Sequence, residues 1–111
     1  MKSEKKQPPH IDYKETLLKR LKDPRACVRI LNAVLDGGNE EAFLLALHDV
    51  AEAQGGISRL ARLCKIHRVT LHRILSMSGN PKLENLTSIL HALGLKLTVI
   101  PEKPQRLNRA A

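Results

Sequence analysis

Basic side chains gather in one stretch of this chain that contains no acidic residue. Between Glu52 and Glu84 there are six Lys or Arg residues and two histidines: Arg59, Arg62, Lys65, Arg68, Arg73 and Lys82, with His67 and His72. Residues 1–52 carry nine basic and nine acidic side chains, so the net charge of +8 arises from residue 53 onward. A solvated helix face usually mixes both signs, so this block indicates binding of a polyanion.

The same stretch has the apolar pattern of two short helices joined by a tight turn. The predicted stripes are Leu60, Ala61 and Cys64 on the first helix and Leu71, Ile74 and Leu75 on the second. This spacing is typical of a DNA-binding helix-turn-helix, although a generic helical hairpin gives the same periodicity. The charge block favours the DNA-binding interpretation.

In a helix-turn-helix the first residues of the second helix face the base edges. With that helix beginning near His67, the predicted base contacts are Arg68, Val69, His72 and Arg73. Arginine can contact guanine through two hydrogen bonds, and Val69 can meet a thymine methyl group. Ser58 is the predicted N-cap of the first helix. The predicted phosphate contacts are Ser58, Arg59, Lys65, Thr70, Asn80 and Lys82. For each basic residue alone, a solvated charge is the alternative.

Helical patterns precede this stretch. Residues 1–11 read as a flexible basic arm or a disordered tail. A helix is expected over residues 12–21, and Asp23-Pro24 opens another that ends at Gly37-Gly38. Its predicted buried side is Cys27, Val28, Leu31, Val34 and Leu35. Asn39 is the predicted cap of the next helix, which buries Phe43, Ala46, Leu47, Val50 and Ala51.

Downstream, Gly79-Asn80-Pro81 is expected to break the second helix and cap another, which buries Leu83, Leu86, Leu90 and Leu93. Residues 95–100 then alternate with period two, which predicts a strand ended by Pro101. Because a lone strand has unpaired edges, we expect the strand, with Leu95, Leu97 and Val99, to pair with its copy across a homodimer, with pairing inside the chain as the alternative. Residues 101–111 are a predicted flexible tail.

Composition limits the class of protein. The chain has 111 residues, of which 42% are apolar and 2% aromatic, so the core is built from aliphatic side chains and an all-α fold is expected. Few aromatic rings argue against stacking of single-stranded nucleic acid and favour duplex DNA. Without an apolar leader or a membrane-length apolar run, a cytoplasmic protein with no membrane partner is expected.

The residues that could support catalysis or bind metals are scattered along the sequence. The five histidines have no ligand spacing, and there is no phosphate-binding glycine loop. Cys27 and Cys64 lie in apolar helical patterns and are expected to be buried reduced thiols rather than disulfide or zinc ligands. We therefore expect no enzyme activity, no catalytic residue, no metal site and no cofactor.

The run LARLCKIHRVTLHRIL resembles the LAxxxGISxxTLSRIL pattern of the Xre/Cro family of lambda-repressor-like regulators. Three further segments, DPRACVRILNAVL, EEAFLLALHDVAEAQGGISRLA and LSMSGNPKLENLTSILHALGLKLTV, resemble the HigA-like antidote proteins of RelE/HigB-type addiction modules. The resemblance extends beyond these segments and covers about residues 12–100. It implies a lambda-repressor-like five-helix domain with the C-terminal strand at 39–100 and an N-terminal helical extension at 12–38. Lys65 replaces the usual turn glycine and His67 the usual Ser or Thr cap.

The resemblance implies an antitoxin that binds a RelE/HigB-like ribonuclease toxin and represses its own operon. The predicted partners are operator DNA, the cognate toxin and a second copy of the chain. The predicted toxin contacts are Tyr13, Leu17 and Leu18, which lie in the electrically neutral half. Two alternatives are a stand-alone, prophage-type repressor without a toxin and an interaction module that does not bind DNA.

Overall fold

The computed structural model describes residues 9–76 and 78–102, which contain six helices and no strand. The helices are α1 (Pro9–Arg20), α2 (Pro24–Asp36), α3 (Glu40–Ala53), α4 (Ile57–Cys64), α5 (Arg68–Ile74) and α6 (Leu83–Ala92). The expectation of an all-α fold is confirmed for these residues. None of these helices has the length and apolar character required to cross a bilayer.

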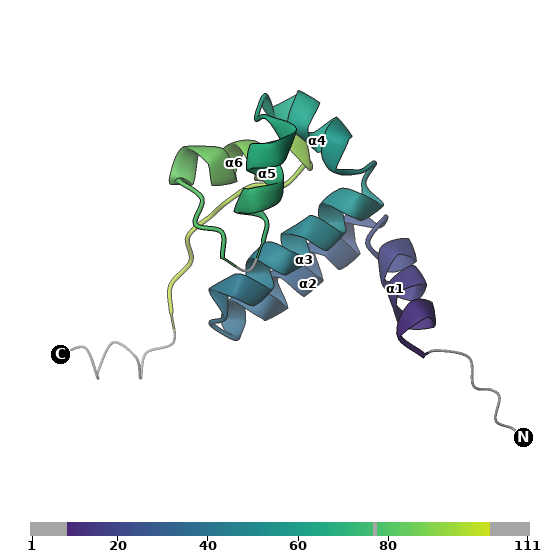
Figure 1. Cartoon of the computed structure of the whole chain (residues 1–111). Helices are drawn as coiled ribbons and strands as arrows, with labels where there is room; N and C mark the ends of the chain where they lie inside the picture. The colour runs from purple at the N-terminus through teal and green to yellow at the C-terminus, as the bar shows by residue number, and fades with distance from the viewer. Residues whose placement is uncertain (1–8, 77, 103–111) are drawn as a thin grey trace, which may run out of the picture.

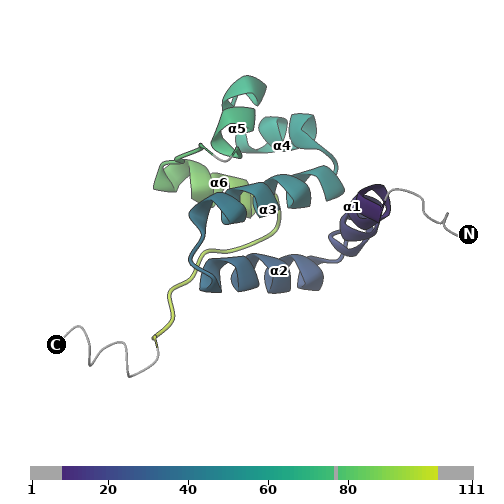
Figure 2. The same cartoon turned by 60° about the horizontal axis from the view of Figure 1, so that its bottom comes forward.

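Helix α3 is the central element of the fold. It contacts α1, α2 and α4, while α4 also contacts α5 and α6. Both views show α2 on one side of α3 and the α4–α6 group on the other (Figures 1 and 2). The largest fully buried side chains come from several elements: Leu21, Leu47, Val50, Leu71, Leu75 and Ile89. The N-terminal helices therefore share one core with α4, α5 and α6.

The predicted inward faces are correct except at three positions. Val28 and Leu35 of α2 are 45% and 47% exposed, and Leu83 of α6 is 67% exposed. Helix α2 is covered mainly by α3, so its apolar stripe is wider than the buried contact. Leu83 is the first residue of α6, and Ile89, which was not predicted, is fully buried.

The two predicted caps in the first half are confirmed. The Asp23 side chain accepts a hydrogen bond from the Arg25 amide at 3.1 Å, and Asn39 accepts one from the Ala42 amide at 3.0 Å. These bonds satisfy amides that the first turn of a helix leaves without partners.

Of the caps predicted in the second half, His67 is confirmed, whereas Ser58 and the Gly79-Asn80-Pro81 motif are wrong. Gly56, not Ser58, is the N-cap of α4, so Ser58 lies within its first turn. Lys82, not Asn80, is the N-cap of α6, and neither cap residue makes a side-chain capping bond. In both places the helix boundary is set by the backbone path between packed helices rather than by a side-chain acceptor.

Residues 95–100 do not form the predicted strand. All regular secondary structure in the described residues is helical. Leu95 packs on the core and its amide donates to the Leu90 carbonyl at 2.8 Å. The segment then runs along α2 (Figure 2), with Val99 96% exposed. A strand needs a second strand, so pairing across a dimer stays a prediction. Residues 1–8 of the expected arm and 103–111 of the expected tail lie outside the described residues.

Candidate nucleic-acid interface

The turn between α4 and α5 is as short as the sequence indicates. Cys64 ends α4, and Lys65 adopts the left-handed conformation with φ 57° and ψ 39°. The amide of Ile66 donates to the Ala61 carbonyl at 3.1 Å. His67 is the N-cap of α5, and its Nδ1 accepts a hydrogen bond from the Val69 amide at 3.3 Å. A lysine and a histidine thus occupy the positions of turn residue and cap.

Helix α5 is buried on one side and open on the other. Leu71, Ile74 and the adjoining Leu75 are buried in the core, as predicted. The residues expected to face DNA bases are all exposed, and Val69 is 64% exposed. Those residues are Arg68, Val69, His72 and Arg73. An exposed valine among cations offers an apolar surface beside hydrogen-bond donors, which is the combination that reads thymine and guanine.

The basic block retains its charge at the surface. All six Lys and Arg side chains between residues 53 and 83 are exposed. Within the described part of the chain, no ion pair joins any of them to a carboxylate; the ion pairs found there involve Lys14 and His48. Arg59 is partly engaged, because its Nη1 donates to the Gln54 carbonyl at 3.2 Å. Exposed cations without carboxylate partners attract phosphate groups.

The predicted phosphate contacts fall mainly into two hollows beside α5. One hollow, of about 400 Å³, is lined by Thr70, Asn80 and Lys82 together with Arg73, and it also contains Glu84. The other, of about 520 Å³, is lined by Ser58, Lys65, Arg62, His67 and Arg68. The fold therefore brings together residues from α4, α5 and the segment before α6. Arg59 is the one predicted phosphate contact that lines neither hollow.

Gly79 shapes the segment that carries Asn80 and Lys82. A Cβ atom at this position would overlap the carbonyl oxygen of Ile74 and lie 2.7 Å from its carbonyl carbon. Only glycine allows the chain to pass so close to the end of α5. The sequence motif was interpreted as a helix cap, whereas its structural role is this close backbone approach.

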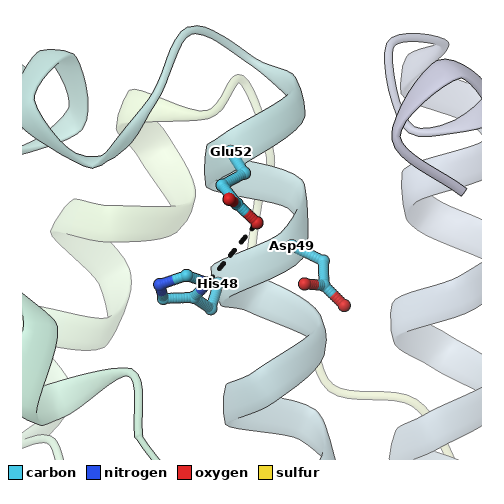
Figure 3. Close-up of side chains that lie close together, drawn as sticks. All are labelled: His48, Asp49 and Glu52. Atoms are coloured by element: carbon cyan, nitrogen blue, oxygen red, sulfur yellow. Dashed lines mark ion pairs between the residues drawn. The ribbon is translucent and has the colours of Figure 1, made fainter. Parts of the chain in front are cut away.

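The fold also joins residues that sequence reasoning treated as scattered. The rings of His48 on α3 and His72 on α5 have centroids 5.5 Å apart and are tilted by 49°. His48 Nδ1 lies 3.9 Å from Glu52 Oε1 (Figure 3). Positions 48 and 52 are one helical turn apart, so their proximity could have been predicted from the sequence. The approach of His72 depends on how α3 and α5 pack.

The predicted toxin contacts lie on α1 and differ in exposure. Tyr13 is 68% exposed, Leu18 is half-buried, and Leu17 is half-buried against the core. Lys14 of α1 forms ion pairs with two carboxylates of α3. Its Nζ lies 3.3 Å from Glu52 Oε1 and 3.6 Å from Asp49 Oδ1. The hydrogen bond to Glu52 and the nearby negative charges raise the pKa of Lys14 above 10.5. Because Leu17 packs against the core, its role is mainly structural.

Cys27 and Cys64 are both free thiols. Cys27 is buried and donates to the Leu21 carbonyl at 3.0 Å, whereas Cys64 is partly buried and donates to the Leu60 carbonyl at 3.0 Å. Burial raises the pKa of each thiol above its ordinary value. A raised pKa lowers the thiolate fraction and hence the reactivity of both groups.

The amino-acid sequence matches a known protein family. The family profile described as "probable addiction module antidote protein" matches residues 13–101. The chain belongs to this family of antidote proteins. An uncharacterized protein of Haemophilus influenzae is 38% identical to this antidote protein over 69 residues, covering 62% of this chain and 70% of the relative. No solved structure matches the chain. Membership supports the role of a non-enzymatic antitoxin in a toxin–antitoxin module and implies a cognate toxin as partner.

Proposed function

We propose that this antidote protein represses its own operon by placing α5 in the major groove of operator DNA. The observation that carries the proposal is the exposed basic surface around α4 and α5, whose cations have no carboxylate partners in the described residues. The short turn at Lys65 and the buried Leu71 hold α5 as an outward-facing helix. This arrangement supports the proposal that the protein reads duplex DNA in the manner of a Xre-type, lambda-repressor-like regulator.

The DNA-binding test compares the module's promoter with a scrambled duplex of equal length. We expect the promoter to bind more tightly, and R68Q or R73Q to lose about 1–3 kcal/mol of discrimination if each arginine contacts a base. K82Q should weaken binding to both duplexes equally. It should also reduce the slope of log affinity against log salt concentration by about 1. R29Q, at an exposed position of α2, is the matched charge control. Equal binding to both duplexes by the parent protein would favour the interaction-module alternative.

We further propose that α1 contributes to binding a RelE/HigB-like ribonuclease toxin encoded beside this protein. Helix α1 has an exposed aromatic ring at Tyr13 and packs mainly on α3, away from α5 (Figures 1 and 2), so the proposed toxin surface is separate from α5. Y13A and L18A should weaken toxin capture and neutralisation, whereas L63A, at a half-exposed leucine of α4, should not. A promoter-specific shift without any captured toxin would favour the stand-alone repressor.

The exposed segment at residues 95–100 supports a proposed homodimer. Leu97 is 44% exposed and Val99 is 96% exposed, and the described chain offers no strand to pair with them. Antiparallel pairing of Leu95, Leu97 and Val99 with a second copy would present two α5 helices about 34 Å apart to one face of DNA. Replacement of Val99 by Pro should lower the measured mass to that of a monomer, because Pro removes a ladder donor.

A further inference from the structure

We propose that a hollow between α2, α3 and the segment leading into α6 seats a part of the cognate toxin that carries Lys or Arg beside apolar side chains. This proposal rests on the proposed antitoxin function, which supplies the partner, and it adds a second contact surface to α1. A protein interface of standard size involves about 20–30 residues on each side. Helix α1 has 12 residues, and Leu17 among them packs on the core, so a second surface is needed.

The hollow has an apolar lining with one side open to water. Its volume is about 560 Å³, and it lies where the end of α2, the first turn of α3 and residues 78–81 meet (Figure 2). Phe43 and Leu44 line it from the core side and are buried, whereas Leu35 of α2 lines it as an exposed residue. An apolar side chain of a partner would remove from water the part of Leu35 that α3 leaves uncovered.

Two exposed carboxylates, Glu40 and Glu41, also line the hollow. Within residues 9–76 and 78–102, no ion pair joins either carboxylate to a cation, and no Lys or Arg lines the hollow. Residues 30–58 contain five acidic side chains and no Lys or Arg, in contrast to the basic block that follows them. The hollow therefore attracts a cationic group, although the whole chain has a net charge of +8.

The toxin is the proposed partner whose charge fits this hollow. A ribonuclease must bind a polyanion, and surfaces that bind RNA are rich in Lys and Arg. Operator DNA carries the opposite charge and is repelled by Glu40 and Glu41, so the hollow and the surface around α5 select different partners. Complementary charges at an interface speed association and fix the orientation of the partner, while the apolar lining adds burial.

One toxin molecule can contact α1 and the hollow at the same time. Lys14 joins α1 to Asp49 and Glu52 near the end of α3, whereas Glu41 lies in the first turn of that helix. Because a helix rises 1.5 Å per residue, these positions are separated by about 12–17 Å along α3. An interface that buries about 800 Å² on each partner is wide enough to span this distance.

The test compares toxin binding by the full-length parent protein and by E40Q/E41Q. The toxin encoded beside this protein is purified, and its association with the immobilised antidote protein is followed at low and at high salt. We expect E40Q/E41Q to associate about tenfold more slowly at low salt and to lose most of the salt dependence, because such charges act mainly on association. E40D/E41D keeps both charges and should bind as the parent protein does.

Two matched controls separate the hollow from general effects. E84Q removes a first-turn carboxylate from α6, outside the hollow, and should leave toxin association unchanged. L35S should speed dissociation of the toxin, whereas V28S, at a similarly exposed position of α2 outside the hollow, should not. Glu40 and Glu41 also stabilise the first turn of α3, so circular dichroism of each variant excludes unfolding as the cause of slower binding.

Toxin binding by E40Q/E41Q with the rate and salt dependence of the parent protein would overturn the proposed surface and leave the antitoxin function intact. Failure of the parent protein to bind the toxin would refute the antitoxin function, and the proposed surface with it. A lower mass of E40Q/E41Q than of the parent protein, measured without toxin, would assign the hollow to a second copy of the chain and overturn the proposal.

Discussion

Replacing Lys65 by glycine separates the backbone cost of the tight turn from the charge that the turn carries. Lys65 has φ 57°, the one positive value among non-glycine residues of the described chain. A left-handed conformation costs an L-residue about 1–2 kcal/mol, and glycine avoids this cost. Glycine in turn destabilises the folded protein by about 0.5–1 kcal/mol, because its unfolded state has the larger conformational entropy. The K65G variant should therefore gain about 0.5–1 kcal/mol of stability, which corresponds to about 2–8 °C in Tm.

The assay is thermal unfolding followed by circular dichroism, with K96G as the matched control. Lys96 is also exposed but has no positive φ, so its replacement by glycine should leave Tm unchanged or lower it. In the DNA assay, K65G should bind more weakly and reduce the salt slope by about 1 if Lys65 contacts a phosphate. A fall in Tm equal to that of K96G would refute the argument that the turn stores backbone strain.

Three further changes test other parts of the structure. Replacing Gly79 by Ala should cost about 1–3 kcal/mol, because the added Cβ overlaps the backbone at the end of α5, whereas G37A in ordinary helical geometry should be nearly neutral by urea unfolding. N39A should lose about 0.5–2 kcal/mol in the same assay through loss of the α3 cap. Contact with Glu52 raises the pKa of Lys14, so its stabilisation is complete below pH 10.5 and is lost as the pH rises through the folded pKa. The parent protein should therefore lose more stability than K14Q between neutral pH and pH 11.

Local rules predicted most of the helices and the inward faces of α4 and α5. Asp23 and Asn39 could be predicted as N-caps, because a side-chain acceptor directly before a helix satisfies the first amides of that helix. The same rule failed at Ser58, where the backbone of Gly56 sets the start of α4 without a side-chain bond. Periodicity identified which residues are apolar but could not show that only part of the stripe on α2 is covered by α3.

The candidate site was predictable in its residue types and not in its assembly. The absence of acidic residues from the stretch around α5 could be counted along the chain, and the exposed positions Arg68 and Arg73 followed from helical spacing. The approach of His72 to His48 depends on the packing of two helices more than twenty positions apart in the sequence, which no local pattern encodes. The close passage of Gly79 beside α5 is likewise a tertiary feature.

The order in which the helices pack has a consequence for how fast the chain folds. Most contacts join helices that are neighbours in sequence or separated by one other helix: α1 with α3, α2 with α3, α3 with α4, α4 with α5, and α4 with α6. Such local connectivity gives a low contact order, and helical domains of this kind fold in microseconds to milliseconds. The first three helices can associate as soon as α3 has been synthesised, whereas α4 and α5 gain their full packing only when Ile89 and Leu90 of α6 arrive. The native surface around α5 therefore forms at the end of synthesis, after the α1 surface is already in place.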